Sequence, residues 1–175
     1  MIITDDKKLR IKCSDVLDDE IDELIKLLEK ELDHSASIGR PGIGLAAPQI
    51  GIAKNIAIVR INKELSFNLI NARINNVYDQ KIFENEGCLS FPGEFVKTLR
   101  YDEIHVTNHY ENKRESFILT GLPAVVWQHE HNHLHEILLS DIAIKDKIIK
   151  KQKMRPNDLC SCGSGKKYKK CCVKA

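Results

Sequence analysis

The sequence has no long apolar run and few aromatic residues. Only 6% of its 175 residues are Phe, Trp or Tyr, and there is a single Trp. No stretch approaches the roughly 20 apolar residues that a membrane-spanning helix needs, and the first residues lack the basic and then apolar order of a secretory signal. These absences argue against a membrane protein and predict a cytoplasmic location.

Cysteine is scarce in most of the chain. Cys13 and Cys88 stand alone, which does not suit a disulfide framework. The other four crowd the last 16 residues, at Cys160, Cys162, Cys171 and Cys172. In a reducing compartment such crowding indicates metal ligation.

The composition is that of an ordinary globular protein, with 42% hydrophobic and 30% charged residues. The net charge of +2 hides an asymmetry, because residues 145–175 hold 11 Lys or Arg against 2 Asp or Glu. The remaining residues carry 16 basic and 23 acidic side chains. We therefore expect one domain over residues 1–150 and a small basic appendage over residues 154–175.

Hydrophobic spacing predicts a mixture of helices and short strands. A helix is expected over Asp18–Leu32 and a loop over His34–Gly42. Strands are expected at Ile56–Ile61 and Phe67–Ile70, followed by a hairpin that pairs Glu103–His109 with Glu115–Leu119.

A second helix is predicted from Gly121 to about His135, with Thr120 as its N-cap and Pro123 in its first turn. It contains His129-Glu130-His131-Asn132-His133, which satisfies H-E-x-x-H. On a helix, His129 and His133 lie one turn apart and can reach one metal ion, with Glu130 beside it.

The motif leaves alternatives open. Histidines also stand at 131 and 135 and form a second pair on nearly the opposite face. On a strand all four would share one face, and an isolated H-E-x-x-H can arise by chance on a solvated helix. A third ligand has to come from elsewhere in the main body, and the candidate is a cysteine, Cys88, which by itself could also be a buried inert thiol.

Three motifs together resemble those of the peptide deformylase family. They are Gly42-Ile43-Gly44-Leu45-Ala46-Ala47-Pro48-Gln49, then Glu86-Gly87-Cys88-Leu89-Ser90, then Gln128-His129-Glu130-His131-Asn132-His133-Leu134. The resemblance implies an α+β fold in which antiparallel sheets surround a central helix that bears His129 and His133. Cys88 would come from a strand or loop beside that helix.

The resemblance also implies an activity, the removal of the formyl group from the methionine of nascent N-formylmethionyl polypeptides. Cys88, His129 and His133 would bind the metal and leave a position open for water. Iron(II) is the native ion that the family favours, although this ligand set also suits zinc, nickel and cobalt. Glu130 would act as general base and then acid.

Other residues of these motifs receive roles from the same resemblance. The Gln49 amide and the Leu89 N–H would stabilise the developing oxyanion. Gly44 and Gly87 would let the substrate backbone lie close. An apolar pocket for the methionine side chain would use Ile43, Leu122, Val125 and Val126, each of which could equally be ordinary core.

The chain departs from the family pattern at four positions. Asn132 replaces an acid, which could weaken metal retention, and Glu136 replaces a glycine, which predicts an altered helix end because glutamate resists positive φ. Ala72 replaces a proline, and Phe95 replaces an arginine that faces the substrate, which puts the strength of substrate binding in question.

The cysteine-rich tail has C-x-C-x8-C-C spacing and resembles the SEC-C motif, a small zinc-binding module. Cys160, Cys162, Cys171 and Cys172 would hold one structural zinc ion and form a zinc knot. The basic residues indicate an anionic partner such as the ribosome, or simply a solvated charged face.

The sequence leaves two rival functions open. One is a different metal hydrolase, such as a protease or another amidase. The other is a binding module that recognises chain N-termini without catalysis, although such a protein has no need for Glu130 beside an open metal position.

Overall fold

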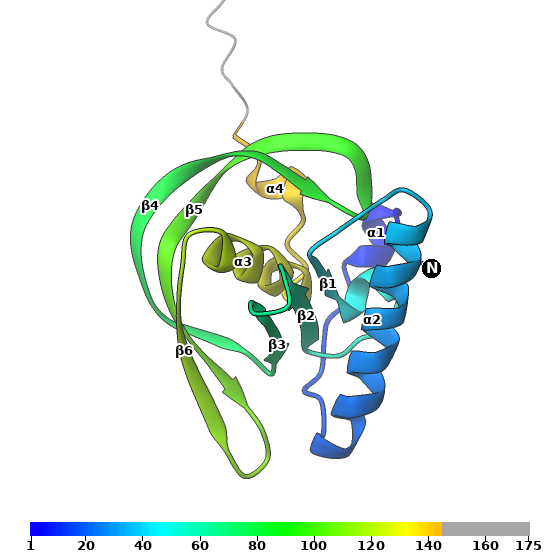
Figure 1. The fold of residues 1–175 in the computed structure, drawn as a ribbon, viewed down its shortest axis with the longest axis vertical. Helices are drawn as coiled ribbons and strands as arrows, with labels where there is room; N and C mark the ends of the chain where they lie inside the picture. The colour runs from blue at the N-terminus through cyan, green and yellow to red at the C-terminus, as the bar shows by residue number, and fades with distance from the viewer. Residues whose placement is uncertain (145–175) are drawn as a thin grey trace, which may run out of the picture. The chain divides into compact units, whose positions relative to one another are not determined.

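The computed structural model describes residues 1–144, which form two antiparallel sheets and several helices (Figure 1). The first sheet has the order β1-β2-β3, with strands Gly44–Ala46, Ile56–Arg60 and Ser66–Ile70. The second has the order β4-β5-β6, with strands Arg73–Cys88, Phe91–His109 and Arg114–Thr120. The expected α+β class is confirmed, whereas the predicted zinc knot of residues 154–175 lies outside the described residues.

The helices are α1 (Asp6–Leu9), α2 (Ile21–Ser37), α3 (Leu122–Leu134) and α4 (Leu139–Ile142). Helix α3 contacts both sheets, through β1 and β2 on one side and β5 and β6 on the other, while α2 packs on β1 and β2. Figure 1 shows β4 and β5 running together as a long curved ribbon around α3. Trp127 of α3 is 1% exposed and lies in the core cluster between the sheets.

Helix α2 differs at both ends from the predicted helix Asp18–Leu32. Its first residues, Asp18–Glu20, form a 3-10 turn, and the helix continues to Ser37, through part of the predicted loop. Gly39, with φ of 80°, ends it: the Gly39 N–H donates to the Ala36 carbonyl at 3.0 Å, and the Arg40 N–H donates to the Ser35 carbonyl at 2.9 Å. The helix is longer than expected because these contacts satisfy its last turn, which apolar spacing does not reveal.

The predicted strands near residues 56–70 and the hairpin are confirmed, with Ile104 paired to Leu119 and His109 to Arg114. The prediction missed β4 and the first half of β5. Most β4 side chains are exposed, and Asp79 and Asn85 have positive φ. Because so little of β4 faces the core, its sequence lacks the alternation of apolar and polar residues that marks a half-buried strand.

Helix α3 begins at Leu122, and Pro123 lies in its first turn as predicted. The predicted N-cap was wrong, because Thr120 is the last residue of β6 and Gly121 occupies the cap position. Gly121 has φ of 64°, which turns the chain from strand to helix, and its N–H donates to the Asp102 carbonyl at 2.8 Å. Because His129, His131 and His133 lie on helix α3, the alternative of a strand that presents four histidines on one face is excluded.

The end of α3 also corrects a prediction. Glu136 adopts φ of 61°, the left-handed conformation that a glycine would favour. The helix therefore ends in the conformation that the family's glycine would take, and the predicted altered end was wrong. Arg10 holds this turn, because its Nη1 donates to the Glu136 carbonyl at 2.9 Å and to Asp141 at 2.8 Å. The surrounding contacts thus stabilise a conformation that costs glutamate about 1 kcal/mol.

None of the helices within residues 1–144 is both long enough and apolar enough to span a membrane.

Candidate metal centre

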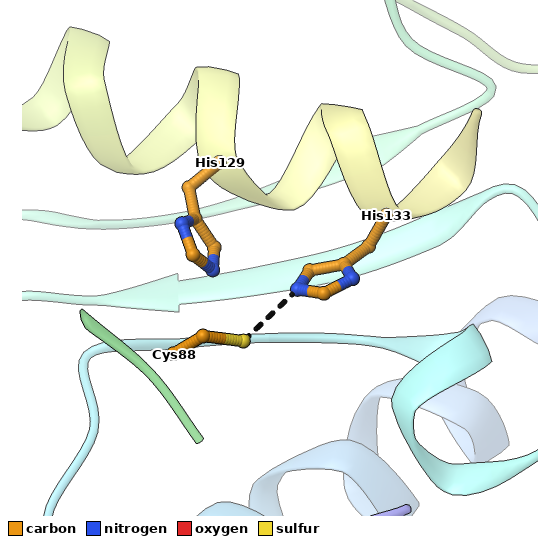
Figure 2. Close-up of side chains that lie close together, drawn as sticks. All are labelled: Cys88, His129 and His133. Carbon is orange, nitrogen blue, oxygen red and sulfur yellow. Dashed lines mark hydrogen bonds between the residues drawn. The ribbon is translucent and has the colours of Figure 1, made fainter. Parts of the chain in front are cut away.

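Cys88, His129 and His133 meet in one buried cluster, with all three ligand atoms within 4.8 Å of one another. Cys88 ends β4, and the two histidines stand one turn apart on α3 (Figure 2). The Cys88 Sγ lies 3.3 Å from His133 Nε2. A thiol and two imidazoles form a donor set that fits a divalent transition metal and leaves a fourth position open.

The two histidines have different surroundings. Burial lowers the pKa of His133 well below its usual value, which keeps the ring in the neutral form that binds metals. Burial also lowers the pKa of His129, but contacts with Cys88 and Glu86 outweigh it and raise the value to about 10. A metal ion at His129 therefore competes with a proton.

Glu86 orients the His129 ring. The ionised carboxylate only accepts hydrogen bonds, so Nδ1 of His129 donates to Oε1 at 2.7 Å and Nε2 is left for a metal. Arg100 binds the same carboxylate through Nε at 2.9 Å and Nη2 at 2.5 Å, and Thr98 donates at 2.5 Å. Burial raises the pKa of Glu86, but the hydrogen bonds from His129 and Arg100 outweigh it and lower the value to about 2.

Glu130 lies beside the cluster and is 3% exposed. Its Oε2 has no hydrogen-bond partner among residues 1–144. Burial raises its pKa to about 7, against the opposing effect of His129. The carboxylate occupies the space above Gly44, where a Cβ would lie 2.9 Å from the carboxyl carbon and closer still to Oε1.

Gln49 is 1% exposed and its amide is fixed at both ends. Oε1 accepts from the Ala46 N–H at 2.9 Å, which orients Nε2 toward Ser90 Oγ at 3.1 Å and Cys88 Sγ at 3.6 Å. Its donor group therefore points at Cys88, one of the three candidate metal ligands. The adjacent Leu89 carbonyl accepts a hydrogen bond from Arg40 Nη2.

The second histidine pair belongs to a different environment. Trp127 stacks on His131 with ring centroids 4.6 Å apart, and His131 stacks on His135 at 4.1 Å. Burial lowers the pKa of His131 to about 3. This pair packs as a stack of rings, which accounts for its presence without a second metal.

A cavity of about 580 Å³ opens beside the cluster. All six predicted substrate-binding residues line it: Ile43, Gly44, Gly87, Leu122, Val125 and Val126. Gln49, Cys88, Leu89, His129 and Glu130 line it as well. His133 is not among the lining residues. The lining also contains Phe95, at the position where the family pattern has a substrate-facing arginine, and residues to which the motifs gave no role, among them Arg40, Phe83 and Phe91.

Sequence reasoning missed the contacts that support the ligands. Glu86 lies within a recognised motif, but its contact with His129 spans 43 residues and its contact with Arg100 spans 14. No sequence spacing predicts such pairs. An acid two residues before Cys88 on a strand was the one available signal, because side chains at i and i+2 share a face.

Comparisons with known proteins agree on one family. A family model described as polypeptide deformylase matches residues 1–148, and a SEC-C motif model matches residues 157–172. The curated peptide deformylase of Pelagibacter ubique is 35% identical over 158 residues, covering 86% of this chain and 91% of that protein. The peptide deformylase of Picosynechococcus is 36% identical and covers 78% and 74%.

Solved structures give the same result. The Thermotoga maritima peptide deformylase aligns with a TM-score of 0.71 at 30% identity, covering 83% of this chain and 97% of that one. A Synechococcus elongatus peptide deformylase in complex with actinonin aligns with a TM-score of 0.71 at 31% identity, covering 83% and 79%. The chain therefore belongs to the peptide deformylase family, whose members use a divalent metal ion to remove the N-formyl group from the methionine of new polypeptides.

Proposed function

We propose that this chain deformylates nascent N-formylmethionyl polypeptides at the cluster of Cys88, His129 and His133. The observation that carries the proposal is the juxtaposition of three metal-ligand atoms within 4.8 Å with Glu130, whose Oε2 is buried and without a partner among residues 1–144. A site that only bound chain N-termini would gain nothing from a buried carboxylate in this position.

Cys88 Sγ and the Nε2 atoms of His129 and His133 would hold the metal ion, which family membership implies and which we propose to be iron(II). When bound, the ion polarises the formyl oxygen and makes a water molecule a strong nucleophile near neutral pH. Glu86 keeps the His129 ring in one orientation throughout, because its carboxylate is fixed in turn by Arg100 and Thr98.

Glu130 takes a proton from the attacking water and returns it to the leaving amine. A pKa of about 7 suits both steps, because the carboxyl group can accept and release a proton near neutral pH. Gly44 serves this step by leaving space for the carboxylate.

The growing negative charge on the formyl oxygen is stabilised by the Gln49 Nε2–H and the Leu89 N–H. Gln49 supports this role because its Oε1 is already held by Ala46, so little reorganisation is needed. Arg40 holds the carbonyl side of Leu89 and thereby steadies that peptide segment.

The methionine side chain is taken up by the apolar part of the cavity. It is lined by Val125 and Val126, which are 6% and 7% exposed, and by Ile43 and Leu122, which are more exposed. Gly44 and Gly87 border the same cavity, although the Glu130 carboxylate and the Phe95 ring lie against them.

The direct test is turnover of formyl-Met-Ala by the full chain loaded with Fe(II) or Ni(II), measured as released formate. We expect turnover, and a Glu130→Gln variant should lose about 100-fold or more in kcat. Glu111→Gln, the same change in an exposed loop, is the matched control. Absence of turnover with metal bound would refute the function, and full activity of Glu130→Gln would refute its role.

We further propose that residues 1–150 form the catalytic domain and residues 154–175 a zinc module. Cys160, Cys162, Cys171 and Cys172 would bind one zinc ion, and the neighbouring lysines would contact the ribosome. Replacing Lys166, Lys167, Lys169 and Lys170 by glutamine keeps the thiols and removes the charge. Salt-sensitive co-sedimentation with ribosomes should be lost in this variant, and unchanged co-sedimentation would contradict the proposed contact.

A further inference from the structure

Asn132 lies on α3 next to the ligand His133, and both ends of its amide have a partner. With the amide turned so that its oxygen faces Arg100, the orientation that satisfies both ends, Oδ1 accepts from Arg100 Nη1 at 2.9 Å and Nδ2 donates to the Gln128 carbonyl at 3.3 Å. One end thus needs an acceptor and the other a donor. An amide supplies both, whereas a carboxylate keeps the acceptor for Arg100 and sets its second oxygen toward the Gln128 carbonyl.

The arginine that Asn132 contacts belongs to a buried ion pair. The side chains of Arg100 and Glu86 are each 5% exposed, and two parallel hydrogen bonds of 2.5 and 2.9 Å join them. Asn132 binds the remaining nitrogen, Nη1, so the guanidinium is fixed on two sides. Such a planar fork holds its partner in one geometry.

The same carboxylate binds the ligand His129. Glu86 Oε1 accepts from His129 Nδ1 at 2.7 Å, so a continuous series of contacts runs from Asn132 through Arg100 and Glu86 to a metal ligand. A shift of Arg100 would therefore move or release the His129 ring. Contacts of this kind alter metal affinity in other proteins by 10- to 100-fold.

The charges in this series balance. Arg100 contributes one positive charge and Glu86 one negative charge, while Asn132 contributes none. A carboxylate at the half-buried position 132 would add an uncompensated negative charge next to the buried Arg100 and Glu86, where charge interactions are less screened than in water. That charge would hold a divalent cation more tightly.

We propose that Asn132 is a positioning residue of the metal centre: it fixes Arg100, and through Glu86 the His129 ring, without adding negative charge, so that metal is held less tightly than with an acid at this position. The inference rests on the proposed function, since it assumes that the cluster binds a metal ion. It assigns Asn132 no contact with substrate or metal.

The test measures metal release from the full chain. Protein loaded with Ni(II) is mixed with an excess of a chromogenic chelator, and the release rate is followed by absorbance. The Cys88→Ala variant identifies the kinetic phase that belongs to this centre, because the tail cysteines are unchanged in it.

Two substitutions should move this phase in opposite directions. Asn132→Asp should slow release about tenfold, and Asn132→Leu, which leaves Arg100 Nη1 without an acceptor, should speed it about tenfold. Asn112→Asp, the same charge change in the exposed turn between β5 and β6, should match the unmodified chain. Near-UV circular dichroism checks that each variant is folded.

The outcomes separate this inference from the proposed function. Release from Asn132→Asp at the unmodified rate or faster would overturn the inference, and so would an unchanged rate for Asn132→Leu if Asn132→Asp fails to fold. If the unmodified chain binds Ni(II) but does not turn over formyl-Met-Ala, the proposed function fails while the release rates still decide the role of Asn132.

Discussion

The carboxylate of Glu130 lies directly against the Cα of Gly44, in the space that any side chain at position 44 would occupy. These residues are far apart in sequence and come from different elements, the edge strand β1 and the helix α3. The glycine of the first motif therefore has a specific structural purpose. It gives Glu130, the proposed general base, room beside the cluster of Cys88, His129 and His133.

Replacing Gly44 by alanine should displace Glu130 and lower kcat by about 100-fold, because small misplacements of a catalytic group have effects of this size. Formate release from formyl-Met-Ala measures the loss. The control is Gly44→Ala in a Glu130→Gln background, because a substitution that acts only through Glu130 has little further effect once the carboxylate is gone. A further 100-fold loss in that double variant would contradict the link to Glu130.

The buried Glu86 should make the metal-free protein sensitive to acid. Its pKa of about 2 in the folded state lies below the ordinary value of 4.5, so the unfolded chain takes up this proton first as pH falls. Its stabilising contribution is present above about pH 5 and is lost as pH falls toward 2, and its size is on the order of 3 kcal/mol. Urea denaturation at several pH values measures the change.

The control for this experiment is Glu86→Gln, which cannot titrate. The difference in unfolding free energy between the two proteins should shrink as the pH is lowered from 5 to 2. Other carboxyl groups titrate in both proteins and cancel in the difference. A difference that stays constant over this range would show that Glu86 is not held in its ionised form.

Helical spacing and a lone cysteine are local signals, and from them come the three proposed ligand residues, which the structure brings together. His129 and His133 follow from a period of 3.6 residues, and the family likeness supplied Cys88 as the third ligand. The residues that hold these ligands could not be predicted in the same way. Glu86 and Arg100 act through long-range contacts, and buried charges look like surface charges in a sequence.

The fold was likewise predictable from the sequence only in part. Strands β2 and β3 are largely buried and were predictable from apolar residues, whereas β4 is mostly exposed and carries no such pattern. Its pairing with β5 depends on backbone hydrogen bonds between residues up to 34 positions apart, such as Arg73 and Thr107. The sequence signals only those elements that bury one regular face.

The strained turn at Glu136 offers a stability prediction. Its φ of 61° is unfavourable for glutamate and free of cost for glycine, so Glu136→Gly should raise the free energy of unfolding by about 0.5–1 kcal/mol. His135→Gly, at a neighbouring residue with φ of −117°, should instead lower it. Urea denaturation of both variants tests the pair, and destabilisation by Glu136→Gly would show that the side chain matters more than the backbone.

Phe95 should contribute to binding of the peptide beyond its methionine. The side chain is exposed to 67%, lines the cavity, and lies so close over Gly87 that a Cβ there would be 2.8 Å from its ring. An apolar ring held in place at a cavity wall gains free energy when a substrate side chain covers it, about 1–2 kcal/mol for partial burial. Phe95→Ala should therefore raise KM for formyl-Met-Ala-Leu about tenfold and change kcat little.

Ile118→Ala is the matched control, because Ile118 is 66% exposed on β6 and does not line the cavity. A fall in kcat with KM unchanged would instead indicate that Phe95 supports the catalytic residues through Gly87, next to Cys88, rather than the substrate.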